Sequence, residues 1–62
     1  MDIKQYIKNK GLETTSIELL KQVILEDYSL SQKSKQELLS TINMFSNAKN
    51  MAELFMMLSG RM

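Results

Sequence analysis

The stretch between Leu12 and Ser59 contains neither proline nor glycine, and this feature most constrains the fold. Proline is absent throughout, and the two glycines of the chain are Gly11 and Gly60. Because these residue types interrupt regular structure most strongly, helix ends in this stretch must be set by side-chain caps and by the apolar pattern. No segment sustains the two-residue alternation of a half-buried strand. The sequence therefore predicts an all-α fold of three to four short helices.

The first helix is predicted over residues 2–10. Asp2 is suited to cap its N-terminus. Its apolar residues recur at helical spacing and form one narrow stripe, which consists of Ile3, Tyr6 and Ile7. Gly11 fits the left-handed position that follows many helices, and Leu12 is placed to fold back onto Ile7 as the hydrophobic contact of a Schellman motif.

The second helix is predicted over residues 16–28. Thr15 and Glu18 have the spacing of a capping box. The apolar face, which Leu19 widens, contains Ile17, Leu20, Val23, Ile24 and Tyr28. Leu25 falls on the polar side, where it is either a single exposed leucine or part of a second contact surface.

The third helix is predicted over residues 32–46, after a turn at residues 29–31. Ser34 begins another capping-box match with Glu37. The apolar stripe of this helix contains Leu38, Leu39, Ile42 and Phe45. Met44 lies well off that stripe and is expected to face elsewhere.

The polar segment 46–50 is predicted to separate the third helix from a fourth. Ser and Asn favour caps and turns because their side chains compete for backbone hydrogen bonds. Asn50 is spaced to cap a last helix over residues 50–59, with Gly60 in the left-handed position beyond it. The alternative is one continuous helix over residues 32–59, about 42 Å long.

The length of the chain limits its stability. A chain of 62 residues forms at most one domain and buries only about 60% of its unfolded surface. It has no cysteine with which to form a disulfide, so it must rely on well-packed helices or on a partner chain. We therefore expect a single helical domain over residues 1–62 that is completed by dimerisation, since two-fold homo-oligomers are the commonest.

The composition argues against enzymatic chemistry. The chain has no histidine and no cysteine, the residues most used in acid–base and thiol catalysis. No glycine-rich phosphate loop is present, and the carboxylates lack the spacing of a hard-cation loop. We expect a protein that is not an enzyme, with no catalytic residue, cofactor or metal site.

The sequence also predicts a soluble cytoplasmic protein without a membrane segment. The N-terminal residues lack an apolar stretch of signal-peptide length, and the apolar run 51–58 is far shorter than a membrane span. The absence of cysteine fits the cytosol. The wealth of Lys, Ile, Asn and Ser is typical of an AT-rich genome, such as that of a low-GC bacterium, its phage or a mobile element.

The last third of the chain is rich in methionine and is the predicted site of contact with another protein. Methionine is unbranched and polarisable, and it is common at adaptable binding surfaces. We expect partner binding or self-association through Met44, Met51, Leu54, Phe55, Met56, Met57 and Leu58. On a helix, Met51, Leu54, Phe55 and Leu58 form the side held by the chain itself. Met56 and Met57, with Met44, form the side that is left for a partner.

The leading functional hypothesis is a small regulator that binds and modulates a larger protein, as an inhibitor or adaptor. A first alternative is a DNA-binding repressor or accessory factor, in which Lys33, Lys35 and Gln36 contact phosphates at a helix N-terminus. A second alternative is a structural assembly or scaffolding protein. The net charge of +1 gives no strong long-range attraction to nucleic acid, and we identify no family from the sequence.

Overall fold

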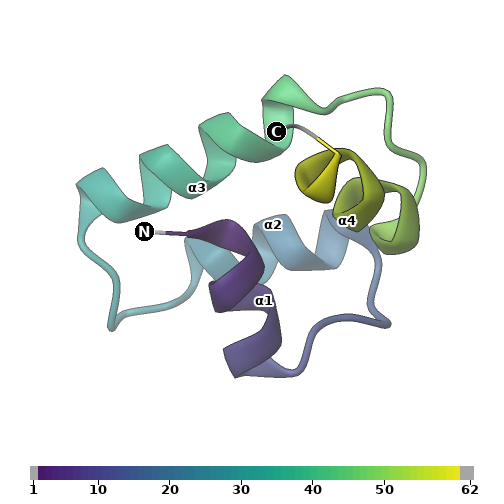
Figure 1. The fold of residues 1–62 in the computed structure, drawn as a ribbon. Coiled ribbons are helices and arrows are strands. Elements are labelled where there is room, and N and C mark those ends of the chain that lie inside the picture. Colours follow the sequence, from purple (N-terminus) through teal and green to yellow (C-terminus); the bar gives the residue numbers. More distant parts are fainter. Residues whose placement is uncertain (1, 61–62) are drawn as a thin grey trace.

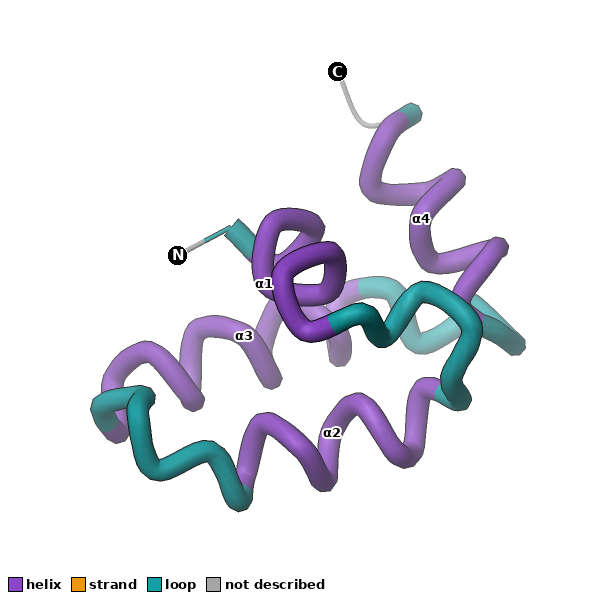
Figure 2. Tube along the Cα trace, turned by 90° about the horizontal axis from the view of Figure 1, so that it is seen from below, coloured by secondary structure: helices purple, strands orange, loops and turns teal. Residues whose placement is uncertain are grey.

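Two antiparallel helices, α2 (Ile17–Leu25) and α3 (Gln32–Met44), form the base of the fold (Figure 1). The other two, α1 (Ile3–Lys10) and α4 (Met51–Ser59), lie against the same side of this pair (Figure 2). The computed structural model describes residues 2–60, and within this range it contains no strand. The predicted all-α class with four short helices is therefore confirmed.

A single hydrophobic cluster draws on all four helices. Its buried members are Ile3, Tyr6, Ile7, Leu20, Ile24, Leu38, Ile42, Met51 and Leu54. The Cα radius of gyration is 10.7 Å, close to the roughly 10.6 Å expected for a folded chain of this length. Among residues 2–60 no buried side chain is polar or charged apart from the tyrosine hydroxyl of this cluster, so the core is held by apolar contact.

Both ends of α1 follow the sequence prediction. The Asp2 carboxylate accepts a hydrogen bond from the Lys4 amide at 3.0 Å, as an N-cap does. At the other end Gly11 has a φ of 68°, a conformation that costs glycine little. The Leu12 amide donates to the Ile7 carbonyl at 3.0 Å, and the Gly11 amide donates to the Lys8 carbonyl at 3.1 Å. These two bonds confirm the Schellman motif.

The start of α2 differs by one residue from the prediction. Ser16, not Thr15, is the N-cap, and its hydroxyl accepts from the Leu19 amide at 3.1 Å. The predicted capping box from Thr15 to Glu18 is therefore wrong. Thr15 and Ser16 are adjacent hydroxyl residues, and both can cap a helix. Sequence spacing places a helix end only to within one or two residues, so it did not decide between them.

The end of α2 lies three residues before the predicted one. Asp27 accepts a hydrogen bond from the Ser29 amide at 3.0 Å, which is the pattern of an Asx turn. This turn takes the chain out of the helix after Leu25. Tyr28, which was predicted to face the core, is 95% exposed. That prediction was wrong because it continued the helical period through the turn.

The connection between α3 and α4 confirms the predicted break. Ser31 caps α3 by accepting from the Ser34 amide at 3.1 Å, so Ser34 lies inside the helix and the capping box predicted for it is wrong. Helix α3 ends at Met44, two residues before the prediction. At Phe45 the backbone leaves the helical region, with φ −113° and ψ 45°. The rival single helix over residues 32–59 is excluded.

Helix α4 begins after the predicted cap Asn50 and ends at Ser59, as predicted. The Asn50 side chain accepts from the Glu53 amide at 2.9 Å, and the Glu53 carboxylate accepts from the Lys49 amide at 2.9 Å. These bonds fix the entry of the helix. Gly60 has φ −83° and ψ 3°, so the left-handed conformation predicted for it is wrong.

Two leucines test how far stability depends on the shared core. Leu54 in α4 is 1% exposed, and Leu25 in α2 is 56% exposed. Leu54→Ala is expected to cost about 2–5 kcal/mol in free energy of unfolding because it leaves a cavity. The matched change Leu25→Ala should stay within about 0.5 kcal/mol. Urea denaturation followed by circular dichroism measures both, and equal losses would contradict the burial of Leu54.

Candidate functional site

Helix α4 has a side that is held by the chain itself. Met51 and Leu54 are 2% and 1% exposed. Phe55 and Leu58 are half-buried and pack against the same cluster. These four residues occupy neighbouring positions on a helix with 3.6 residues per turn. They anchor α4 on the base of the fold and fix its rotation about its own axis.

The opposite side of α4 faces solvent. Met56 is 73% exposed, and its helical position is about 170° from the mean direction of Met51 and Leu54. The exposed residues Ala52 and Ser59 lie beside it. We call these three residues, Ala52, Met56 and Ser59, the outer face of α4. Met56 is the large apolar side chain of this face.

The structure separates the residues that were predicted to form one partner surface. Met51 and Leu54 lie in the core, so another chain could reach them only if the fold opened. Met57 is half-buried at the edge of α4. Met44 is 63% exposed but belongs to the end of α3. Only Met56 is placed at the centre of an outward helical face, as the spacing predicted.

The alternative nucleic-acid residues lie at the start of α3. Lys33 and Gln36 are exposed, whereas Lys35 is half-buried. The Lys35 ammonium donates to the Leu25 carbonyl at 2.8 Å and lies 5.8 Å from the centre of the Tyr28 ring. Cations at a helix C-terminus stabilise it, so Lys35 serves the end of α2. This contact uses one of the three donors of the Lys35 ammonium.

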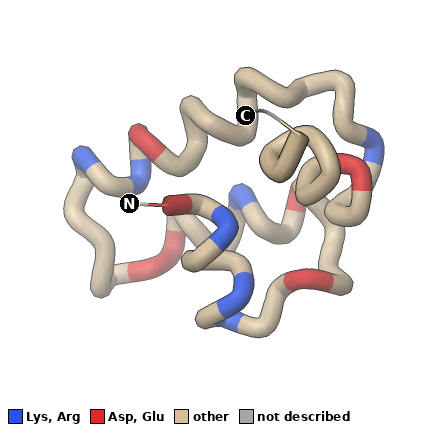
Figure 3. The backbone as a smooth tube through the Cα atoms, viewed as in Figure 1, with Lys and Arg blue, Asp and Glu red and all other residues tan. Residues whose placement is uncertain are grey.

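Charged residues are mixed over the whole surface. Figure 3 shows basic and acidic segments interspersed along the helices and loops rather than gathered on two faces. Binding to nucleic acid draws its strength from many lysine or arginine contacts with phosphates. The charge distribution therefore gives little support to the DNA-binding alternative.

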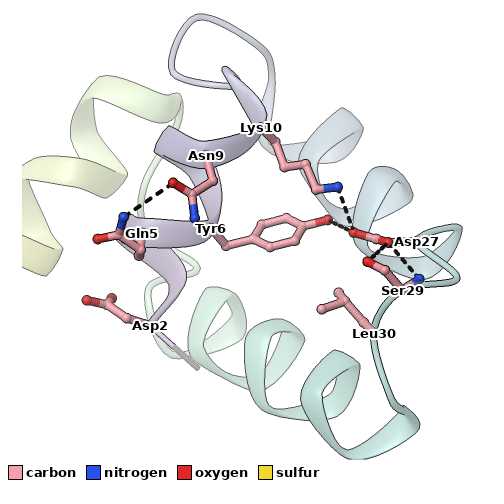
Figure 4. A pocket seen from close by; sticks show the side chains of 8 residues that line it. All are labelled: Asp2, Gln5, Tyr6, Asn9, Lys10, Asp27, Ser29 and Leu30. Carbon is pink, nitrogen blue, oxygen red and sulfur yellow. Dashed lines mark hydrogen bonds and ion pairs between the residues drawn. The ribbon is translucent and has the colours of Figure 1, made fainter.

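A polar cluster that the sequence did not predict joins α1 to the loop after α2. The Tyr6 hydroxyl donates to Asp27 Oδ2 at 2.8 Å, and the Lys10 ammonium lies 3.3 Å from the same oxygen (Figure 4). The Ser29 hydroxyl and amide both donate to Asp27 Oδ1. One carboxylate thus holds two segments that lie 21 residues apart along the chain.

The interactions in this cluster shift the pKa values of Asp27 and Tyr6 in opposite directions. The hydroxyl of Ser29, the hydroxyl of Tyr6 and the amide of Ser29 donate to Asp27 and hold the pKa of its carboxyl well below its usual range. Burial, followed by the hydrogen bond to Asp27 and the charge of Asp27, raises the pKa of Tyr6 to about 12. Both shifts favour the protonated tyrosine and the ionised aspartate, which are the forms that bond to each other.

The cluster borders a surface depression of about 330 Å³. The residues that line it are Asp2, Gln5, Tyr6, Asn9, Lys10, Asp27, Ser29 and Leu30. Several of these residues are hydrogen-bonded within the protein: Gln5 donates to Asn9 at 3.3 Å, and the Asp2 carboxylate accepts from the Lys4 amide. The bonds to Asp27 join α1 to the loop after α2 and so stabilise the fold. The Asp-Tyr-Ser sequence at residues 27–29 is an Asx-turn signal. It could have revealed the bonds between Ser29 and Asp27, but not the bond from Tyr6.

Metal binding and membrane insertion find no support among the residues that the structure describes. No group of three or more acidic side chains in this range is placed to hold a metal ion. No helix in this range is both long and apolar enough to cross a membrane.

Comparisons of the chain with known families, curated proteins and solved structures found no similar protein. No protein-family model matches the chain, and neither a curated protein nor a solved structure is significantly similar to it. Its function must therefore be argued from its own surface.

The raised pKa of Tyr6 gives a spectroscopic prediction. In a Tyr28→Phe variant Tyr6 is the only phenol, so ultraviolet phenolate absorbance reports on it alone. Its midpoint is expected near 12, because burial and Asp27 disfavour the phenolate. Asp27→Asn in this background should lower the midpoint, while burial should keep it above the ordinary value of about 10. A midpoint near 10 with Asp27 present would contradict the bond.

The lowered pKa of Asp27 gives a prediction about acid stability. A carboxyl whose pKa is depressed by folding stabilises the fold above its unfolded pKa, near 3.9, and this contribution is lost as the pH falls. The urea midpoint of the wild type should therefore exceed that of Asp27→Asn at pH 7. The difference should shrink as the pH falls below about 4. Glu26→Gln, which removes a neighbouring exposed carboxylate, is the control and should not reproduce the pattern.

Proposed function

We propose that this chain is a small, non-enzymatic regulator that binds and modulates a larger cytoplasmic protein, as an inhibitor or adaptor. In this proposal it also self-associates through the outer face of α4. The observation that carries the proposal is the 73% exposure of Met56 on a helix whose opposite side is anchored in the core.

The character of this face supports protein contact over other uses. Met56 offers a flexible, polarisable side chain that adapts to irregular surfaces. Half-buried Phe55 and Met57 lie beside it along the helix and could extend the contact at little cost in ordering, because packing already restrains them. The anchored helix presents these side chains in a fixed arrangement.

The two alternatives have less support. Lys35 is engaged with the end of α2, which weakens the case for a DNA-binding factor. An assembly or scaffolding protein would require two different faces that join head to tail. Leu19 and Leu25 of α2 and Met44 of α3 are also exposed, but a two-fold contact through the outer face of α4 closes a dimer without a second face.

Replacing Met56 by lysine tests this proposal. Met56→Lys should leave the helical circular dichroism signal and the urea midpoint nearly unchanged, because the side chain makes no core contact. It should convert an associated wild type into a single chain in sedimentation equilibrium. It should also prevent the tagged chain from retaining the larger protein that the wild type captures from a lysate of its source cells.

A matched control places the same charge elsewhere. Ser40 is exposed on the polar side of α3, so Ser40→Lys should keep both association and capture. Wild-type chain that sediments as a monomer at all concentrations would overturn self-association through α4. Capture that is equal for the wild type and Met56→Lys would overturn the use of this face for the partner.

A further inference from the structure

The methionines of this chain differ sharply in exposure. Met56 and Met44 are 73% and 63% exposed, whereas Met51, in the same helix as Met56, is 2% exposed. The chain has no cysteine, so no thiol competes for an oxidant. An oxidant in solution therefore meets accessible thioethers first, and on α4 it meets Met56.

We propose that Met56 is an oxidation site through which a peroxide switches off the outer face of α4. In the reaction a lone pair of the Met56 sulfur attacks one oxygen of hydrogen peroxide. A sulfur–oxygen bond forms as the oxygen–oxygen bond breaks, and the remaining oxygen leaves as water after proton transfer. The sulfur loses two electrons, the peroxide gains them, and the product is methionine sulfoxide.

The position of Met56 makes the consequence local. A sulfoxide is polar and disrupts apolar contacts, but the outward direction of Met56 keeps the new oxygen in solvent. The fold therefore persists while the centre of the outer face becomes polar. Oxidation of Met51 would instead place a polar group in the core, which is costly without a hydrogen-bond partner. Because sulfoxides can be reduced enzymatically, the change at Met56 is reversible.

This inference rests on the proposed function, since the switch acts on the association that the outer face provides. The oxidation step itself is measured on the chain alone. Graded hydrogen peroxide treatment with peptide mass mapping should show Met56 oxidised faster than Met51, on the order of tenfold or more, because Met51 reacts only when the fold opens locally. The helical signal should persist when Met56 is fully oxidised. Equal rates at Met56 and Met51, or loss of the helical signal with Met56 oxidation, would overturn the proposal.

Two variants then test the switch. Met56→Leu keeps an apolar side chain without sulfur, so the association that it retains should not change after peroxide. Met56→Gln approximates the polarity of the sulfoxide and should fail to associate without any treatment. Sedimentation equilibrium measures both, and circular dichroism confirms that each variant is folded.

The outcomes separate this inference from the proposed function. If untreated wild type and Met56→Leu associate but peroxide-treated wild type also stays associated, the switch is wrong and the association stands. If peroxide dissociates Met56→Leu as readily as the wild type, another residue is responsible and the assignment to Met56 is wrong. If neither untreated protein associates, the proposed self-association fails and the switch fails with it.

Discussion

The structure depends on one small apolar core to which every helix contributes. The helices contain 8, 9, 13 and 9 residues, and isolated helices shorter than about 12–15 residues are marginal in water. Three of the four therefore persist only because their apolar residues are buried together. Ile7 of α1, Ile24 of α2 and Leu54 of α4 meet in the same cluster. Removing any one helix would expose the apolar faces of the others.

Much of this fold was predictable because local chemistry and burial agree. Three helix ends are set by residues whose chemistry suits that position. Asp2 and Asn50 cap the N-termini of α1 and α4, and Gly11 adopts the left-handed conformation after α1, all as predicted. The break after α3 followed from the polar residues 46–50. On α4 the helical period correctly separated the buried residues Met51 and Leu54 from the exposed Met56.

The errors arise where a non-local contact or a competing local bond decides the outcome. Periodicity placed Tyr28 on the core face of α2, but the Asx turn at Asp27 ends the helix first. Tyr6 was recognised as apolar and buried, yet its hydroxyl meets Asp27 across 21 residues, and no spacing rule reports such a contact. The contact between Lys35 and the end of α2 is also non-local, and no spacing rule predicts it.

The buried side of α4 fixes the position of its exposed side, because both belong to one rigid helix. Because Met51 and Leu54 are buried and fix the helix, Met56 is held in position. In the function proposed here for α4, this restraint lowers the entropy lost on binding. Asp27 helps indirectly to hold α4 in place. It binds Tyr6 of α1, and the Lys4 ammonium of α1 donates to the Ser59 hydroxyl of α4 at 3.1 Å. Because positive and negative charges are mixed over the surface, long-range electrostatic attraction would add little to the rate at which this face encounters a partner. In the proposed function, recognition by the outer face of α4 therefore rests on shape and apolar contact, and so on how firmly the small core holds α4.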